Sequence, residues 1–238
     1  MTHTVDCFRS RDRVTIPERT RNTQSSDPSM TTELTPKSYT VDIAGVPVEL
    51  PLVAINDTLA ISLLMVIDMG VKFGERTGKA LAQRLAGAMP EIVVGTATLG
   101  IPVAIEVSRS LGLDNYVICQ KSPKIHLGDA LTQQVTSVTS SGSQRLLLDR
   151  RSIPLLRGKR VVVVDDVVAT GSSLAATLKL VRQAGADVVG IGVILTEGHE
   201  WREPLGADAR LVVGLGHIPQ FRIENGRATP MPESLARN

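Results

Sequence analysis

The sequence predicts an α/β protein with a twisted, mostly parallel sheet and helices on both faces. Two observations favour this fold class. Apolar stretches of strand length alternate with stretches of helical periodicity along residues 91–196, which is the order of a parallel sheet with helical crossovers. The strands are apolar throughout rather than at alternate positions, as expected for strands buried on both faces. With 238 residues, 42% of them hydrophobic, the chain can bury a sizeable core.

The expected elements follow one another in a regular order. Residues 39–50 predict a short hairpin that turns near Gly45. Residues 58–69 predict a very apolar helix, and residues 72–89 predict an amphipathic one. Further strands are expected over 91–95, 116–120, 160–164, 187–196 and 211–214, further helices over 102–111 and 172–184, and a β-pair from 132–139 and 145–149.

Composition and charge argue against several classes of protein. The net charge is +2, from 26 basic and 24 acidic residues, which is too balanced for an electrostatic nucleic-acid binder. The longest apolar stretch, Leu59–Met69, contains Ser62 and Asp68 and is far shorter than the roughly 18 residues of a membrane span. Cys7 and Cys119 are the two cysteines, so we expect no disulfide framework and a reducing, cytoplasmic compartment.

The first 38 residues are expected to form a disordered tail. They are rich in Thr and Ser, contain several prolines and show no helical or strand periodicity. A secretory signal requires an apolar segment after the early charges, and none is present here. The acidic residues argue against a transit peptide. Met30 is an alternative start of the chain. Residues 39–238 are then expected to form one domain.

The segment 161–173 carries most of the functional information. Val161–Val164 predicts a buried strand, and Asp165 and Asp166 follow at its carboxyl end, where ligands bind in open α/β sheets. The turn that comes next opens a helix, whose free N–H groups form an anion site. Gly171 allows a phosphate to approach the backbone, and hydroxyls nearby add donors. The alternative is a helix cap beside a solvated acid pair. We favour a phosphate cradle with acids that accept hydrogen bonds from sugar hydroxyls.

This segment resembles the signature of the type I phosphoribosyltransferases, which bind 5-phosphoribosyl-1-pyrophosphate (PRPP). The resemblance covers about residues 39–222 and is nearest to the adenine and xanthine enzymes of purine salvage. It implies a flexible catalytic loop, a small hood over the base formed largely by residues 39–70, and a homodimer. It also implies that Asp165 and Asp166 contact the ribose hydroxyls and are catalytic. The residues implied to bind the 5′-phosphate are Ala169, Thr170, Gly171, Ser172 and Ser173.

A second part of the family pattern falls on residues 95–101. In the resemblance this is the diphosphate loop, in which Thr96, Ala97 and Thr98 hold the diphosphate. The adenine enzymes usually carry an acid at the position of Ala97 and an arginine at that of Leu99, and both are missing here. The xanthine enzymes also lack a basic residue there. The alternative is an ordinary turn between a strand and a helix.

Residues 120–129 resemble the start of the flexible loop of the xanthine enzymes. Lys121 is implied to be catalytic, and Lys124, joined by His126, is implied to bind the diphosphate, as point charges suited to phosphate. The alternative is that these are ordinary exposed cations. Residues 127–139 would form the arms of the loop, which closes over the site to exclude water.

The base is expected to contact residues on either side of the phosphate site. Asn56 resembles an asparagine that lies near the base in the xanthine enzyme, and its amide can donate and accept. The alternative is that Asn56 caps a helix. His199 or Trp201 is positioned to stack on the base, although a lone Trp more often belongs to a core or an interface.

The resemblance implies Mg²⁺-dependent transfer of phosphoribosyl from PRPP to a purine base, giving a nucleoside 5′-monophosphate and diphosphate. The ion is expected to be held through PRPP rather than by the protein directly. Asp166 is the best candidate to accept the purine proton. A non-catalytic PRPP-binding regulator, suggested by the missing basic residue at Leu99, stays open as an alternative, as does an RNA-binding protein of the same fold. We expect no membrane or nucleic-acid partner.

Overall fold

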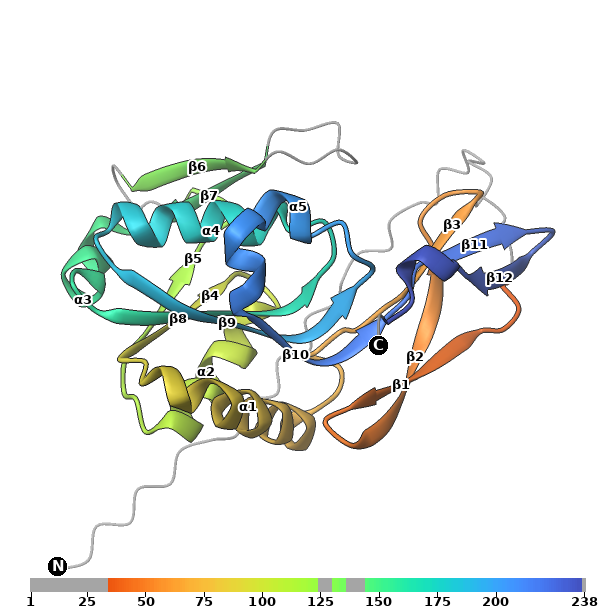
Figure 1. The fold of residues 1–238 in the computed structure, drawn as a ribbon, viewed down its shortest axis with the longest axis horizontal. Helices are drawn as coiled ribbons and strands as arrows, with labels where there is room; N and C mark the ends of the chain where they lie inside the picture. The colour runs from red at the N-terminus through yellow and green to blue at the C-terminus, as the bar shows by residue number, and fades with distance from the viewer. Residues whose placement is uncertain (1–33, 124–129, 136–143, 237–238) are drawn as a thin grey trace, which may run out of the picture. The chain divides into compact units, whose positions relative to one another are not determined.

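The computed structural model describes residues 34–123, 130–135 and 144–236. Its centre is a five-stranded sheet in the order β10-β9-β8-β4-β5 (Figure 1). Neighbouring strands of this sheet are parallel throughout, which confirms the predicted fold class. The strands are β4 (Ile92–Thr96), β5 (Tyr116–Cys119), β8 (Arg160–Val168), β9 (Asp187–Glu197) and β10 (Val212–Ile218).

Helices cover both faces of the parallel sheet (Figure 1). Helices α1 (Val71–Leu85) and α2 (Gly100–Leu111) pack on one face, and α4 (Ser172–Gln183) packs on the other. Successive side chains of β8 point to opposite faces of the sheet, because side chains alternate across a strand. Val162 and Val164 join the core under α1 and α2, whereas Val161 and Val163 join the core under α4. Each buried valine contributes about 1.5–3 kcal/mol of burial free energy.

Short helices complete the connections. The α-helical turns are α3 (Ile153–Leu156) and α5 (Arg202–Leu205), and the 3₁₀ turns are Ala86–Ala88, Arg150–Ser152, Gly206–Leu211 and Pro232–Ser234. In the described part of the chain, no helix is both long and apolar enough to cross a membrane.

A second, smaller sheet is antiparallel and has the strand order β1-β2-β3-β11-β12. Its strands are β1 (Ser38–Ile43), β2 (Val46–Ala54), β3 (Leu59–Ser62), β11 (Phe221–Glu224) and β12 (Arg227–Pro230). The sheet has its own core, which includes Leu34, Ala60 and Phe221. Three of its strands lie between residues 38 and 62, mostly within the range 39–70 from which a hood was expected, and two come from the C-terminal part of the chain.

A two-stranded hairpin extends the α4 side of the core. Strands β6 (Leu131–Val135) and β7 (Gln144–Leu148) pair antiparallel, where a β-pair was predicted. Leu146 and Leu148 are buried in the core that α4 covers, so the hairpin is anchored by apolar burial. Of the loop expected to begin at residues 120–129 and to have its arms over 127–139, residues 124–129 and 136–139 lie outside the described residues, as does the turn at 140–143.

The structure corrects the prediction of a helix over residues 58–69. Residues 59–62 form β3, which pairs with β2 and β11, and turns follow it. A short apolar run does not by itself distinguish a strand from a helix, and the pairing with β11 decided the outcome here. Strand β8 also continues to Val168 and β10 to Ile218, beyond the predicted ends at 164 and 214. Strands β11 and β12 were not predicted.

Candidate functional site

The site lies at a switch point of the parallel sheet. Strands β4 and β8 are neighbours, but the helix that follows β4 and the helix that follows β8 cover opposite faces. Such a point leaves a crevice at the carboxyl ends of the strands, where ligands bind in open α/β sheets. The pairing of β4 with β8 ends at Gly95 and Val164. The crevice therefore begins at Asp165, the next residue of β8.

Asp165 and Asp166 lie inside β8, where Asp165 is still paired with Val193 of β9. Both are half-buried, and the Asp166 N–H donates a hydrogen bond to Asp165 Oδ1 at 3.1 Å. Burial, and then the negative charge of Asp166, raise the pKa of Asp165 well above its usual value. Burial also raises the pKa of Asp166, and the charge of Lys121 acts in the opposite direction on the pKa of both carboxyls. The pair therefore has favourable interactions to gain from hydroxyl donors or added positive charge.

The turn after β8 has the geometry of an anion site. Gly171 is the N-cap of α4, with a φ of 76° and no side-chain hydrogen bond to the cap. The first helical bond runs from Ala175 N–H to Gly171 O, at 2.8 Å. The Ser172 N–H makes only a long hydrogen bond, 3.5 Å, to Thr170 Oγ1. The N–H groups of Ser173 and Leu174 precede the helical ladder and can bind an anion. The structure thus joins this turn to the acid pair, as the sequence predicted.

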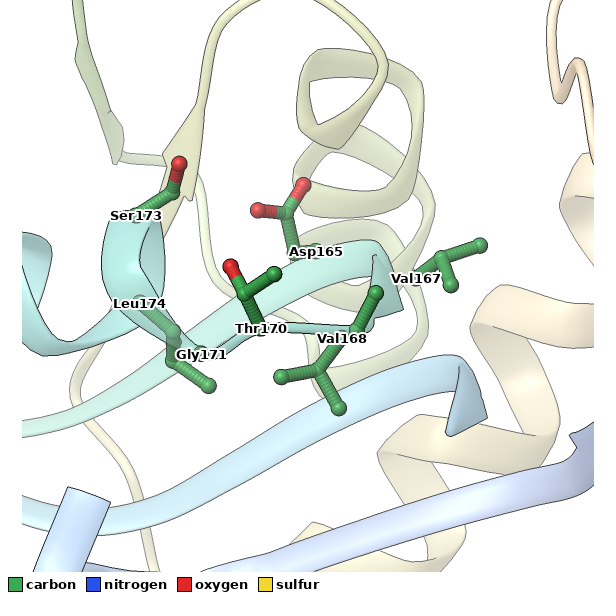
Figure 2. A pocket seen from close by; sticks show the side chains of 8 residues that line it. Asp165, Val167, Val168, Thr170, Gly171, Ser173 and Leu174 are labelled. Atoms are coloured by element: carbon green, nitrogen blue, oxygen red, sulfur yellow. The ribbon is translucent and has the colours of Figure 1, made fainter. Parts of the chain in front are cut away.

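A cavity of about 190 Å³ connects Asp165 with this turn. In Figure 2, the carboxylate of Asp165 and the hydroxyls of Thr170 and Ser173 lie on the same side of the end of β8. The lining residues are Asp165, Val167, Val168, Ala169, Thr170, Gly171, Ser173 and Leu174. Acceptors and donors therefore face one space that suits a phosphorylated polyol.

The loop after β4 lies against the acid pair. A Cβ atom added at Gly100 would stand 2.8 Å from Asp165 Oδ1, so only glycine allows this approach. The peptide bond between Ala97 and Thr98 is cis. The Ala97 N–H donates to Cys119 O at 2.9 Å, so this N–H is used within the fold. This leaves Thr96 and Thr98 of the three residues expected to hold the diphosphate.

The hydroxyl of Thr96 is also used within the fold. Thr96 is buried, and its Oγ1 lies 3.1 Å from Thr177 Oγ1. Thr177 donates to Ser173 O at 2.9 Å, so Thr96 donates to Thr177. This chain of hydrogen bonds fixes the end of β4 to the first turn of α4. Thr96 thereby positions the two halves of the site.

Asn56 does not cap a helix but shapes the turn between β2 and β3. Its Oδ1 accepts hydrogen bonds from Thr58 N at 2.9 Å, Thr58 Oγ1 at 3.0 Å and Leu59 N at 2.9 Å. The amide nitrogen is the part of this side chain left for a base. Lys124 and His126 lie outside the described residues.

Trp201 and His199 are held by the protein itself. Trp201 is buried, and its Nε1–H donates to Gly198 O at 3.2 Å. Its backbone supports the phosphate turn, because a Cβ added at Gly171 would stand 2.8 Å from Trp201 O. The His199 ring stacks on His217 with 5.3 Å between centroids and an interplanar angle of 16°.

Two residues at the same edge of the sheet were not singled out from the sequence. Glu197, the last residue of β9, is buried, and burial followed by the charge of Glu200 raises its pKa to about 7. His217 lies near the end of β10, and burial is the main cause that lowers its pKa. Their position at the carboxyl ends of predicted strands was the signal available in the sequence.

The fold and the site together define a parallel α/β protein in which an acid pair and a helix N-terminus meet at a switch point of the sheet. The family model described as phosphoribosyl transferase domain matches residues 72–214. The chain therefore belongs to the phosphoribosyltransferase family, as the sequence predicted.

Relatives and solved structures agree with this assignment. The chain is 31% identical over 156 residues to a xanthine phosphoribosyltransferase of Laribacter hongkongensis, covering 65% of this chain and 81% of the relative. It is 29% identical over 123 residues to an orotate phosphoribosyltransferase of Caldanaerobacter subterraneus, covering 52% and 53%. A structure of adenine phosphoribosyltransferase from Saccharomyces cerevisiae has a TM-score of 0.56 and 21% identity, covering 76% and 96%; this likeness concerns the fold.

Proposed function

We propose that the protein transfers the phosphoribosyl group of PRPP to a purine base, releasing diphosphate and a nucleoside 5′-monophosphate. One observation carries the proposal. Asp165 of the acid pair and the first turn of α4 line a single cavity, which matches a ribose hydroxyl beside the 5′-phosphate of PRPP. The similarity to a protein named for xanthine supports a purine as the acceptor.

The acid pair provides the main electrostatic contribution to the reaction. With the 5′-phosphate on the turn of residues 169–173, Asp165 and Asp166 accept hydrogen bonds from the ribose hydroxyls. Positive charge develops on the ribose as diphosphate leaves. Two half-buried carboxylates with raised pKa values stabilise this charge more strongly than carboxylates in water do. The purine nitrogen then forms the new bond to the sugar, and we assign its proton to Asp166.

Cations and backbone groups stabilise the leaving diphosphate. Lys121 is exposed, and its charge reaches both acids, so it is placed to pair with the diphosphate beside them. Lys124 and the loop that contains Thr98 complete this half of the site in the proposal.

Mg²⁺ fits the site as a partner of the substrate. Among the described residues, no group of three or more His, Cys, Asp or Glu is arranged to hold a metal ion. Asp165 and Asp166 offer the oxygen ligands that Mg²⁺ prefers, and they would hold the ion through ribose hydroxyls or water. When bound, the ion neutralises charge on the diphosphate.

We also propose that the enzyme is a cytoplasmic homodimer. Ile67 and Val71 are 57% and 82% exposed, and both border an apolar groove of about 290 Å³ beside α1 and α2. A surface that carries both protruding apolar side chains and a groove can pair with a second copy of itself. Sedimentation of Ile67→Asp as a monomer, against a wild-type dimer, would support this interface; a monomeric wild-type protein would exclude it.

The test of the function is diphosphate release from PRPP and Mg²⁺ across adenine, guanine, hypoxanthine, xanthine, orotate and uracil. Release with one purine would establish the activity and identify the base. Absence of release with every base, together with PRPP binding in calorimetry, would favour the regulator instead.

The acid pair needs a separate test with a matched control. Asp166→Asn should cost far more activity than Lys124→Ala. Asp187→Asn makes the same chemical change at the amino end of β9, on the opposite edge of the sheet, and should leave activity unchanged. Equal, small losses in all three variants would contradict a catalytic role for the acid pair.

A further inference from the structure

A second cavity lies between helix α1 and strand β2. Its volume is about 470 Å³, against about 190 Å³ for the cavity beside Asp165, and it falls in the range of about 300–1,000 Å³ that is usual for small-molecule sites. None of its lining residues lines the cavity beside Asp165 or has a role in the proposed reaction. They are Val46, Pro47, Val48, Glu49, Met69, Lys72, Phe73 and Arg76.

Two cations of this cavity lack a counter-ion. Lys72 and Arg76 are one helical turn apart, so both side chains lie on the same side of α1. Within the part of the chain that the structure describes, neither head group forms an ion pair, and Arg76 Nε is buried without a hydrogen-bond partner. A buried donor without a partner carries a desolvation cost, which a bound acceptor removes. The pair therefore favours an anionic ligand.

The start of α1 strengthens the positive potential here. The N-cap is Gly70, no side chain bonds to the cap, and the first turn contains no acidic residue. The partial positive charge of a helix N-terminus is thus left without a negative side chain in that turn, and it acts together with the charge of Lys72.

Glu49 gives the cavity an acceptor on the β2 side. Its Oε1 accepts a hydrogen bond from Ser38 Oγ on the neighbouring strand β1. Among the described residues, no ion pair joins this carboxylate to Lys72 or Arg76. The acid and the two cations therefore belong to one cavity without neutralising each other by direct contact.

The remaining surface of the cavity is mainly apolar. Val48 and Phe73 are buried, and Met69 is half-buried. The Arg76 guanidinium lies over the Phe73 ring, 5.4 Å from its centroid, which is a cation–π contact. Planar groups stack well on surfaces built from aromatic and guanidinium groups.

We propose that this cavity is a second binding site, separate from the reaction site, for a nucleoside phosphate. Its three kinds of surface match the three parts of such a ligand. Lys72 and Arg76 pair with the phosphate, Glu49 accepts hydrogen bonds from the hydroxyls or the amino group, and the base lies on the apolar surface. Inorganic phosphate would leave the apolar surface unused and would be repelled by Glu49. The inference does not depend on the proposed function.

This site is compatible with the proposed dimer. Val71 and Gly74, which line the apolar groove beside α2, lie on the opposite side of α1 from Lys72 and Arg76, because the helix turns by about 100° per residue. A nucleotide bound between α1 and β2 therefore leaves the groove available to a second copy of the chain.

Calorimetry with adenosine 5′-monophosphate tests the site, with PRPP and Mg²⁺ at saturation to occupy the reaction site. We expect one nucleotide to bind per chain under these conditions. Lys72→Gln removes the charge of an exposed side chain and should weaken this binding about tenfold, the effect of one lost charge-assisted hydrogen bond. Arg76→Lys retains the charge but loses the planar fork and its stacking, and should also weaken the binding.

Lys79→Gln is the matched control. Lys79 is an exposed cation of the same helix that does not line the cavity, and its loss should change the affinity less than about twofold, because charges in water are screened. A second readout is the amide chemical shifts of Val48 and Phe73, which the nucleotide should change in the wild-type protein and not in Lys72→Gln.

Three results would overturn the inference. They are absence of nucleotide binding when PRPP is saturating, unchanged affinity in Lys72→Gln, and equal weakening in Lys79→Gln and Lys72→Gln. The second and third would show binding elsewhere or a general effect of charge. If PRPP itself gives no binding heat, the proposed function fails instead. The comparison of Lys72→Gln with Lys79→Gln in the absence of PRPP then decides the nucleotide site.

Discussion

Substitution of Gly171 by alanine tests the packing that supports the phosphate turn. Gly171 has a φ of 76°, in the left-handed region that costs a residue with a side chain about 1–2 kcal/mol. The added Cβ would also stand 2.8 Å from Trp201 O and 2.9 Å from Trp201 Cα. Both are backbone atoms, so the contact is not relieved by a rotamer change, and overpacking of this kind costs about 1–3 kcal/mol. The sum predicts a destabilisation of about 2–5 kcal/mol.

Gly112 offers a matched control for the conformational part of this cost. It has a φ of 72° at the end of α2, and a Cβ added there would meet nothing within 4 Å. Urea unfolding of Gly112→Ala therefore measures the cost of the left-handed conformation alone, about 1–2 kcal/mol. The excess loss in Gly171→Ala measures the contact with Trp201.

The same substitution should weaken the binding of PRPP. A shift of the turn away from Trp201 misaligns the N–H groups that face the phosphate, and a loss of about 1.4 kcal/mol is a tenfold loss of affinity in calorimetry. Equal losses of stability in the two alanine variants would refute the packing argument. Unchanged PRPP affinity in Gly171→Ala would refute the assignment of this turn to the phosphate.

Three further predictions concern stability and the metal. The pKa of Glu197 is raised from 4.5 to about 7, so the folded state binds the proton more tightly and stability falls as the pH rises between these values. Glu197→Gln should remove this fall of about 3 kcal/mol, as measured by urea unfolding between pH 4.5 and 8. Thr177→Val removes the acceptor of the buried Thr96 hydroxyl and should cost about 1–3 kcal/mol in the same assay. Chelation of Mg²⁺ should abolish diphosphate release but leave the unfolding midpoint unchanged, since the ion is proposed to bind with PRPP; a lower midpoint would indicate a metal site in the protein itself.

The parallel sheet could be predicted because its signals are local. The run Val161–Val164 has the composition of a buried strand wherever its neighbours lie, and α1, α2 and α4 have helical periodicity within their own residues. The small sheet could not be predicted in full, because β3 pairs with β11 through Phe221 and Ala60. The apolar run that contains β3 is equally compatible with a helix until its distant partner β11 is known.

In the candidate site, too, the features that are local in the sequence could be predicted and those that depend on distant residues could not. Asp165, Asp166 and the turn 169–173 are contiguous in the sequence, so their chemistry could be inferred together. The supporting residues come from other loops and reach the site through strand register. Trp201 lies behind Gly171, and Thr177 meets Thr96, because α4 and the ends of β4 and β9 converge there. The sequence could not show that the Thr96 hydroxyl and the Ala97 N–H are used within the fold.

The position of the acid pair inside β8, rather than after it, has a consequence for catalysis. In a mobile loop, two adjacent carboxylates would move apart and gain water, and their pKa values would return toward normal. Here Asp165 is in register with Val193 and Val167 with Leu195, so β9 fixes the backbone on both sides of Asp166. The partner on the other side, β4, stops pairing at Val164, and this leaves room for the substrate. The sheet therefore keeps the negative charge in place before the substrate binds, so little reorganisation is needed when positive charge develops on the ribose.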